Sequence, residues 1–147
     1  MRIERIGPAV VAALLLVTSG LPAFAHHAFG SEFDSNRPVL LKGKVVRVEW
    51  VNPHAWIHME VTNADGTKEV WMIEGSSPNS LLRRGVTKES LKVGTEIVVD
   101  GYQSRDYTLK RANGRNVTYP DGRQLNLGSS NPDADKDPPA RTQPTTK

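Results

Sequence analysis

The chain has 147 residues, enough for a single domain. It contains no cysteine, which excludes disulfide bonds, a thiolate metal site and a cysteine nucleophile. Its formal net charge is +3, too small to argue for a nucleic-acid or membrane-surface partner.

The first 25 residues are predicted to be a secretory signal peptide. Arg2 and Arg5 give a positive start, residues 9–17 are an uninterrupted run of Ala, Val and Leu, and Ala23 and Ala25 form a small-x-small cleavage site. A membrane anchor would need about 20 apolar residues, and Thr, Ser, Gly and Pro break this run. We therefore expect cleavage after Ala25 and a periplasmic or secreted chain without a stable membrane span.

Two segments flank the predicted domain. Residues 26–38 form an amino-terminal lead-in of uncertain order. Residues 129–147 are rich in Pro, Asp, Lys, Ser and Thr and have almost no apolar side chains, so we expect a disordered tail. Residues 39–128 between them are predicted to form a β-barrel domain.

Three strands are predicted in the first half of this domain. Residues 39–51 are rich in Val and Leu, and Gly43 is the natural point for a bend. Residues 55–62 alternate, so that Ala55, Ile57, Met59 and Val61 face one way and Trp56, His58, Glu60 and Thr62 the other. A turn at residues 63–66 leads to a third strand at residues 67–74.

A short helix follows the third strand. Ser77 is a suitable cap, Pro78 fits the first helical position, and Gly85 ends the helix. Residues 87–91 form a further turn, residues 95–102 a fourth strand, and residues 113–119 and 123–127 a last hairpin. This order predicts a mainly β fold: a small, partly open barrel of the oligonucleotide/oligosaccharide-binding (OB) type, with five or six strands and one short helix between strands three and four. A flat meander with a helix on one face is the alternative.

The predicted mature chain begins with His26 and His27. A free α-amine and an imidazole both lose protons easily near neutral pH, and imidazole suits copper, zinc and nickel. His26 could chelate a divalent ion through its amine and its ring together. This arrangement resembles the copper-binding amino-terminal histidine of the histidine-brace monooxygenases. Two histidines that follow a signal peptide by chance are the alternative.

A second group of candidate residues lies at the start of the second strand. Asn52 falls in the loop before it, and His54, Trp56 and His58 share the face opposite Ile57. On a regular strand His54 and His58 are about 13 Å apart, so two imidazoles can barely share one ion. Each histidine then acts separately, or one of them joins His26 or His27. A Trp packed under the helix beside a half-exposed His58 is the structural alternative.

The OB-type fold gives this group a location of interest. In such folds the face of strands two and three and the loop between strands one and two bind ligands. Trp50 and Trp71 are expected at the edges of this surface. Because an exported protein meets little nucleic acid, a planar small molecule, a sugar or a partner protein is the expected ligand.

Short motifs along the whole mature region resemble one bacterial family of exported proteins, the domain of unknown function 6152 family. The most specific is Asn-Pro-His-Ala-Trp at residues 52–56. The others lie at residues 25–29, 32–34, 41–43, 49–50, 81–85 and 101–102. The resemblance implies export and a β-rich domain, and it implies no activity and no site residues.

Two functional hypotheses follow from the sequence. The first is a non-catalytic periplasmic binding module that presents Asn52, His54, Trp56 and His58. The second is a copper or zinc carrier built on His26 and His27, with help from His54 or His58. An enzyme is not expected. A catalytic serine in the loop at residues 74–79 would need a base and an orienting group, and the spacing of the sequence indicates neither.

Overall fold

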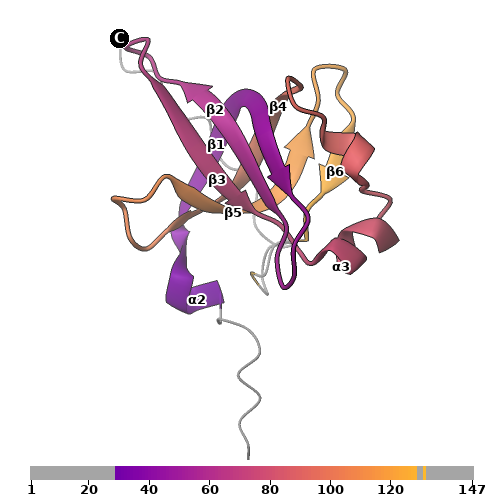
Figure 1. Ribbon diagram of the computed structural model, residues 1–147. Helices are drawn as coiled ribbons and strands as arrows, with labels where there is room; N and C mark the ends of the chain where they lie inside the picture. The colour runs from indigo at the N-terminus through magenta and orange to yellow at the C-terminus, as the bar shows by residue number, and fades with distance from the viewer. Residues whose placement is uncertain (1–28, 129–130, 132–147) are drawn as a thin grey trace, which may run out of the picture.

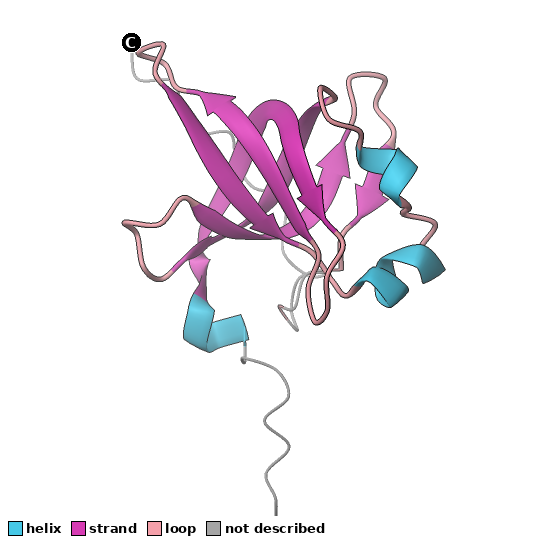
Figure 2. Ribbon diagram, in the orientation of Figure 1, coloured by secondary structure: helices cyan, strands magenta, loops and turns pink. Residues whose placement is uncertain are grey.

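The computed structural model describes residues 29–128 and residue 131. In this part the chain forms a strongly curved sheet with short helical segments at its ends (Figure 1, Figure 2). The elements in chain order are α2 (Phe29–Glu32), β1 (Phe33–Glu49), β2 (Trp56–Thr62), β3 (Lys68–Glu74), α3 (Pro78–Arg83), the 3-10 helix η1 (Lys88–Leu91), β4 (Glu96–Ser104), β5 (Arg111–Thr118) and β6 (Gln124–Asn126).

The strands hydrogen-bond into a ring. Their order in the sheet is β3-β2-β1-β4-β5-β6, and β3 also pairs with β5 in parallel. The circuit therefore runs β1-β2-β3-β5-β4 and returns to β1, while β6 extends β5 as a hairpin. The helix α3 lies between β3 and β4 along the chain. The predicted mainly β, OB-like fold is thus confirmed.

Strand β1 joins the two halves of the ring. Its residues 38–44 pair with β4 and its residues 43–49 pair with β2, so Gly43 has partners on both sides. Figure 1 shows β1 bent into an arch. A side chain at Gly43 would obstruct this arrangement, because an added Cβ would lie 2.2 Å from the carbonyl oxygen of Glu60. Gly43 is therefore a position where the backbones of β1 and β2 lie too close together for a side chain.

The folded region begins earlier than the sequence predicts. Strand β1 starts at Phe33 and not at residue 39, and the helix α2 precedes it. Phe29 and Phe33 pack with Tyr102 of β4 in a small aromatic cluster, with ring centroids 5.8 Å apart for the two phenylalanines and 5.4 Å for Phe29 and Tyr102. Residues 29–38, expected to be a lead-in, therefore belong to the packed structure. The predicted signal peptide lies outside the described residues, as does the whole predicted tail, residues 129–147, except residue 131.

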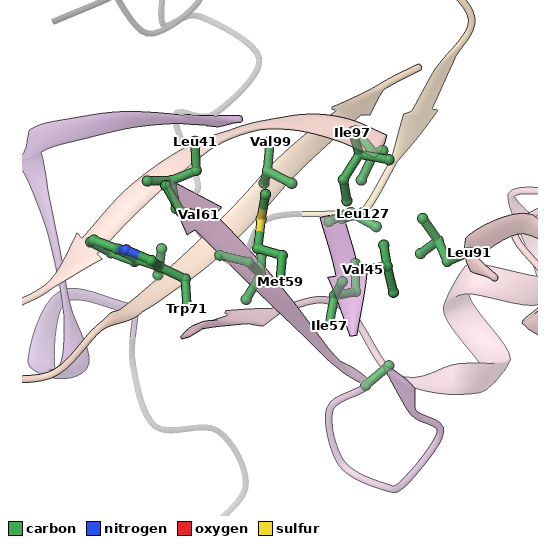
Figure 3. Packing of buried hydrophobic residues seen from close by; sticks show 14 of the residues in the cluster. Leu41, Val45, Ile57, Met59, Val61, Trp71, Leu91, Ile97, Val99 and Leu127 are labelled. Carbon is green, nitrogen blue, oxygen red and sulfur yellow. The ribbon is translucent and has the colours of Figure 1, made fainter. Parts of the chain in front are cut away.

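The inside of the ring is the main hydrophobic core (Figure 3). The predicted alternation in β2 holds, since Ile57 and Met59 are fully buried. Trp71, which lies opposite Met59 in β3, is also buried in this core and not at the edge of the outer face, where it was expected. Leu81 of α3 and Leu91 of η1 add their side chains to the same core, so these two helical segments cover part of it.

The helix α3 has the boundaries that its sequence predicts. The Ser77 hydroxyl accepts a hydrogen bond from the Ser80 amide at 3.3 Å, and Pro78 is the first helical residue. Gly85 follows the helix with a φ of +78°, a conformation in which glycine pays no steric penalty. No helix in residues 29–128 has the length and apolar content needed to cross a membrane.

The close approach of β1 and β2 at Gly43 gives a first prediction. Gly43→Ala should lower the free energy of unfolding by about 1–3 kcal/mol, because the new methyl group forces the backbones of β1 and β2 apart. Gly30→Ala is the matched control, since nothing lies within 4 Å of an added Cβ there and alanine favours the helix. Urea unfolding followed by circular dichroism measures both. Equal stability of the two variants would show that the close approach at Gly43 is not required.

Candidate functional site

A groove of about 550 Å³ lies where the two ends of β1 come together. We call it the amino-terminal groove. The helix α2 and the start of β1 form one wall with Phe29 and residues 31–33, and the loop between β1 and β2 forms another with residues 51–54. Trp56 of β2, Glu74 of β3 and Arg111 of β5 complete the lining. Three of the four residues predicted from sequence, Asn52, His54 and Trp56, therefore line one groove.

Trp56 stands at the start of β2 and is half-buried. In the sheet it pairs with Glu49 on one side and Glu74 on the other. The guanidinium carbon of Arg111 lies 4.3 Å from the centre of its ring, within the range of a cation–π contact. Arg111 also donates to the Glu32 carboxylate, with 2.9 Å between Nη1 and Oε1. One face of Trp56 is thus covered by an arginine that α2 holds in place.

His54 reaches the groove from the loop before β2. Two backbone hydrogen bonds fix this loop against the chain after β3, from Gly75 to Ala55 at 2.9 Å and from Ala55 to Ser76 at 3.1 Å. The His54 Nδ1 atom lies 3.3 Å from the Gly75 carbonyl oxygen and 3.5 Å from Oε1 of Glu74. Because a carbonyl oxygen only accepts, a hydrogen bond to Gly75 requires a proton on Nδ1 of His54.

Glu74 is the buried charge of the groove, with only 4% of its surface exposed. Asn113 of β5 donates a hydrogen bond to its Oε1 at 3.1 Å. Burial raises the pKa of the Glu74 carboxyl above its ordinary value, and the nearby Glu32 carboxylate raises it further, against the opposing effects of His54, Asn113 and Arg111. The groove therefore contains a carboxylate that its surroundings stabilise incompletely.

His58, the fourth predicted residue, does not line the groove. It shares the outer face of β2 with Trp56, but it is buried and paired with the neighbouring strand. Its Nε2 atom lies 2.8 Å from Oε1 of Glu49 and 3.2 Å from Nη2 of Arg47, and these two side chains also contact each other. The half-exposed His58 of the structural alternative is therefore not found, because Arg47 and Glu49 of β1 contact the ring.

The candidate metal ligands are not brought together among residues 29–128. No group of three or more His, Asp or Glu side chains in this region has the arrangement that could hold a metal ion. His54 and His58 have separate partners, Glu74 and Glu49. His26 and His27 lie outside the described residues.

Sequence reasoning missed the charged residues of the groove. Glu32, Glu74 and Arg111 are ordinary charged positions in the sequence, and they meet only because β3 pairs with β5 and α2 folds back against the sheet. One signal for Glu74 was available in the sequence. It is a charged residue at the end of a predicted strand, at a position that faces outward. Trp50, expected at the edge of the surface, instead packs partly buried against the main core.

The fold and the groove define a small, mainly β domain with a candidate binding site at the junction of its first helix and first loop. Comparison of the sequence with known families matches residues 13–113 to the family of unknown function DUF6152, and the chain belongs to that family. The match includes every residue that lines the amino-terminal groove. No curated protein and no solved structure matches the chain.

The raised pKa of Glu74 predicts a pH dependence of stability. A carboxyl whose pKa is higher in the folded than in the unfolded state costs stability as pH rises above its ordinary value of 4.5. Glu74→Gln removes this cost. The variant should therefore become more stable relative to the wild type as pH rises from about 4 to about 7. Urea titrations of the unprocessed chain, which has no α-amine at His26, measure the difference at several pH values.

Glu69→Gln is the control with the opposite sign. The Lys110 side chain, which hydrogen-bonds to Glu69, holds the pKa of that carboxyl below its ordinary value. That pairing stabilises the fold above pH 4.5 and is lost as pH falls. The Glu69→Gln variant should therefore lose stability relative to the wild type over the same pH rise. A Glu74→Gln curve that follows the Glu69→Gln curve would contradict the assignment of Glu74.

Proposed function

We propose that the chain is an exported, non-catalytic binding module that takes its ligand or partner in the amino-terminal groove. The observation that carries the proposal is the meeting of Asn52, His54 and Trp56 with the buried Glu74 in one groove of about 550 Å³. This volume falls in the usual range of small-molecule sites. Cleavage after Ala25 would place the groove in the periplasm or outside the cell.

The polar groups of the groove support binding more than catalysis. Arg111 is engaged with Glu32 and Trp56, and His54 with the Gly75 carbonyl and Glu74. Ser77, in the loop considered for a nucleophile, caps α3 with its hydroxyl. A nucleophile needs a base within hydrogen-bond reach, and a hydroxyl that caps a helix is engaged elsewhere.

The stacked pair of Arg111 and Trp56 favours a planar ligand group. A guanidinium is flat and stacks on planar systems as an aromatic ring does. A planar molecule, a sugar or an aromatic side chain of a partner protein could therefore lie against this pair, with Asn52 and His54 at its polar edge. The net charge of the predicted mature chain, (19 − 2) − (16 − 1) = +2, gives no reason to expect nucleic acid.

The binding hypothesis predicts the effect of two matched histidine substitutions. His54→Ala should abolish capture of a partner from a periplasmic extract, as should Trp56→Ala, because both remove part of the groove lining. His58→Ala is the control, since its side chain lies on the same strand but outside the groove. Pull-down with the immobilised mature protein, quantified by mass spectrometry, measures capture, and circular dichroism verifies folding. Loss of capture in all three variants alike would count against the groove as the site.

A second candidate function is the transport of copper or zinc. The observation in its favour is that Phe29, three residues after His26, lines the same groove as His54. A suitable set of nitrogen ligands would be the amine of His26, the rings of His26 and His27, and the Nε2 atom of His54. The carrier needs the free amine that cleavage after Ala25 would create.

Copper titration tests the carrier. Because metal ligands must be deprotonated, binding of copper(II) should weaken sharply between about pH 7 and about pH 5. A chain with one extra residue before His26 should bind more weakly, and His54→Ala should do so while His58→Ala does not. Isothermal titration of the untagged mature protein measures each affinity. Equally weak binding by the authentic and the extended chain would eliminate the carrier.

A further inference from the structure

Glu74 has no permanent positive charge as a close partner among the described residues. Its ion-pair contact there is with His54 at 3.5 Å, and its hydrogen bond is with the neutral amide of Asn113. Arg111, the guanidinium of the groove, pairs instead with Glu32 and lies over Trp56. A buried carboxylate is costly unless it is paired, so Glu74 would gain from a cation in the groove.

The charge of the described lining points the same way. The lining contains two carboxylates, those of Glu32 and Glu74, and one guanidinium, that of Arg111. Apart from His54, the ionisable side chains of the lining therefore carry one more negative than positive charge. Trp56 also lines the groove, with one face of its ring already covered by Arg111. The groove is therefore complementary to a positively charged group.

The chain itself brings such a group to the groove. Phe29 is part of the wall, and His26 comes three residues before it. Three residues span at most about 10 Å, so the amino terminus of a chain cleaved after Ala25 is always close to the groove. A tethered group has an effective concentration in the millimolar range, which a free amine or a partner's lysine rarely reaches.

We infer that the amino-terminal groove is a cation site and that its occupant is the processed amino terminus of this chain, with the α-ammonium and the imidazoles of His26 and His27 against Glu74 and Glu32. This inference rests on the proposed export and cleavage and on the groove as the binding site. It gives the groove a regulated state, because an external ligand or partner must displace the terminus. It also opposes metal binding, since a protonated amine cannot chelate.

Protection of the terminus from an exopeptidase tests the inference. The mature protein, shown by intact mass to begin at His26, is treated in EDTA with a cysteine dipeptidyl aminopeptidase, which needs no metal and removes the first two residues. Cleavage of a docked terminus follows the small population in which it is released. We expect Glu74→Gln to lose His26 and His27 about tenfold faster than the wild type. Glu69 is a carboxylate of the same strand outside the groove, so Glu69→Gln should lose the two residues at the wild-type rate.

A second measurement does not depend on a substitution. In the NMR spectrum of the mature protein, nuclear Overhauser contacts should join the ring protons of His26 or His27 to those of Trp56 or His54. A chain with Gly-Ser added before His26 should shift the Trp56 indole signal. These contacts remain decisive even if Glu74→Gln does not fold.

The outcomes separate this inference from the proposed function. Equal cleavage of wild type and Glu74→Gln, with no contact between the terminus and Trp56, would overturn the docked terminus. Copper(II) binding that needs the free amine of His26, together with no contact between the terminus and Trp56 in the metal-free protein, would overturn it in favour of the metal carrier. If the docked terminus fails while His54→Ala still abolishes partner capture, the groove remains the binding site and only its internal occupant is disproved.

Discussion

The bend of β1 is the constraint on which the groove depends. A straight strand of 17 residues would be about 56 Å long, yet Phe33 at its start and Val51 just beyond its end line the same groove. The strand pairs with β4 up to Lys44 and with β2 from Gly43 onward, and its register with β2 shifts between Val45 and Arg47. At Gly43 the backbone of β2 occupies the space of a side chain. The same bend closes the ring around the core. Fold and groove therefore have one geometric origin.

The sequence predicted the features that depend on local pattern. The alternation from Ala55 to Thr62 placed the correct face of β2 in the core, and the Ser77-Pro78 pair located α3. The start of β1 was missed because residues 34–38 are polar or proline, and their pairing with β4 is interrupted between Phe33 and Pro38. Contacts that are distant in sequence hold that segment in the fold: Phe29 and Phe33 pack on Tyr102, Tyr107 hydrogen-bonds to Asp34, and Arg111 pairs with Glu32.

The site was predictable in part for the same reason. Asn52, His54 and Trp56 lie within five residues of one another, so a turn and a strand suffice to bring them together. Glu32 and Arg111 are 79 positions apart, and no periodicity in the sequence relates them. Their contact requires the parallel pairing of β3 with β5. The predicted order of strands implies that pairing, but it does not say which residues of the two strands lie opposite each other. The electrostatic character of the groove could thus be read only from the structure.

Two histidines four residues apart acquire different roles through the charges beside them. The carboxylate that receives His58, Glu49, also contacts Arg47, so that cluster already contains a permanent cation for its anion. The carboxylate beside His54, Glu74, is more deeply buried and has no arginine within ion-pair distance among the described residues. A satisfied cluster has little to gain from a ligand, whereas an incompletely neutralised buried charge does. The difference in counter-charge, more than the shared strand or residue type, distinguishes His54 and its groove from His58.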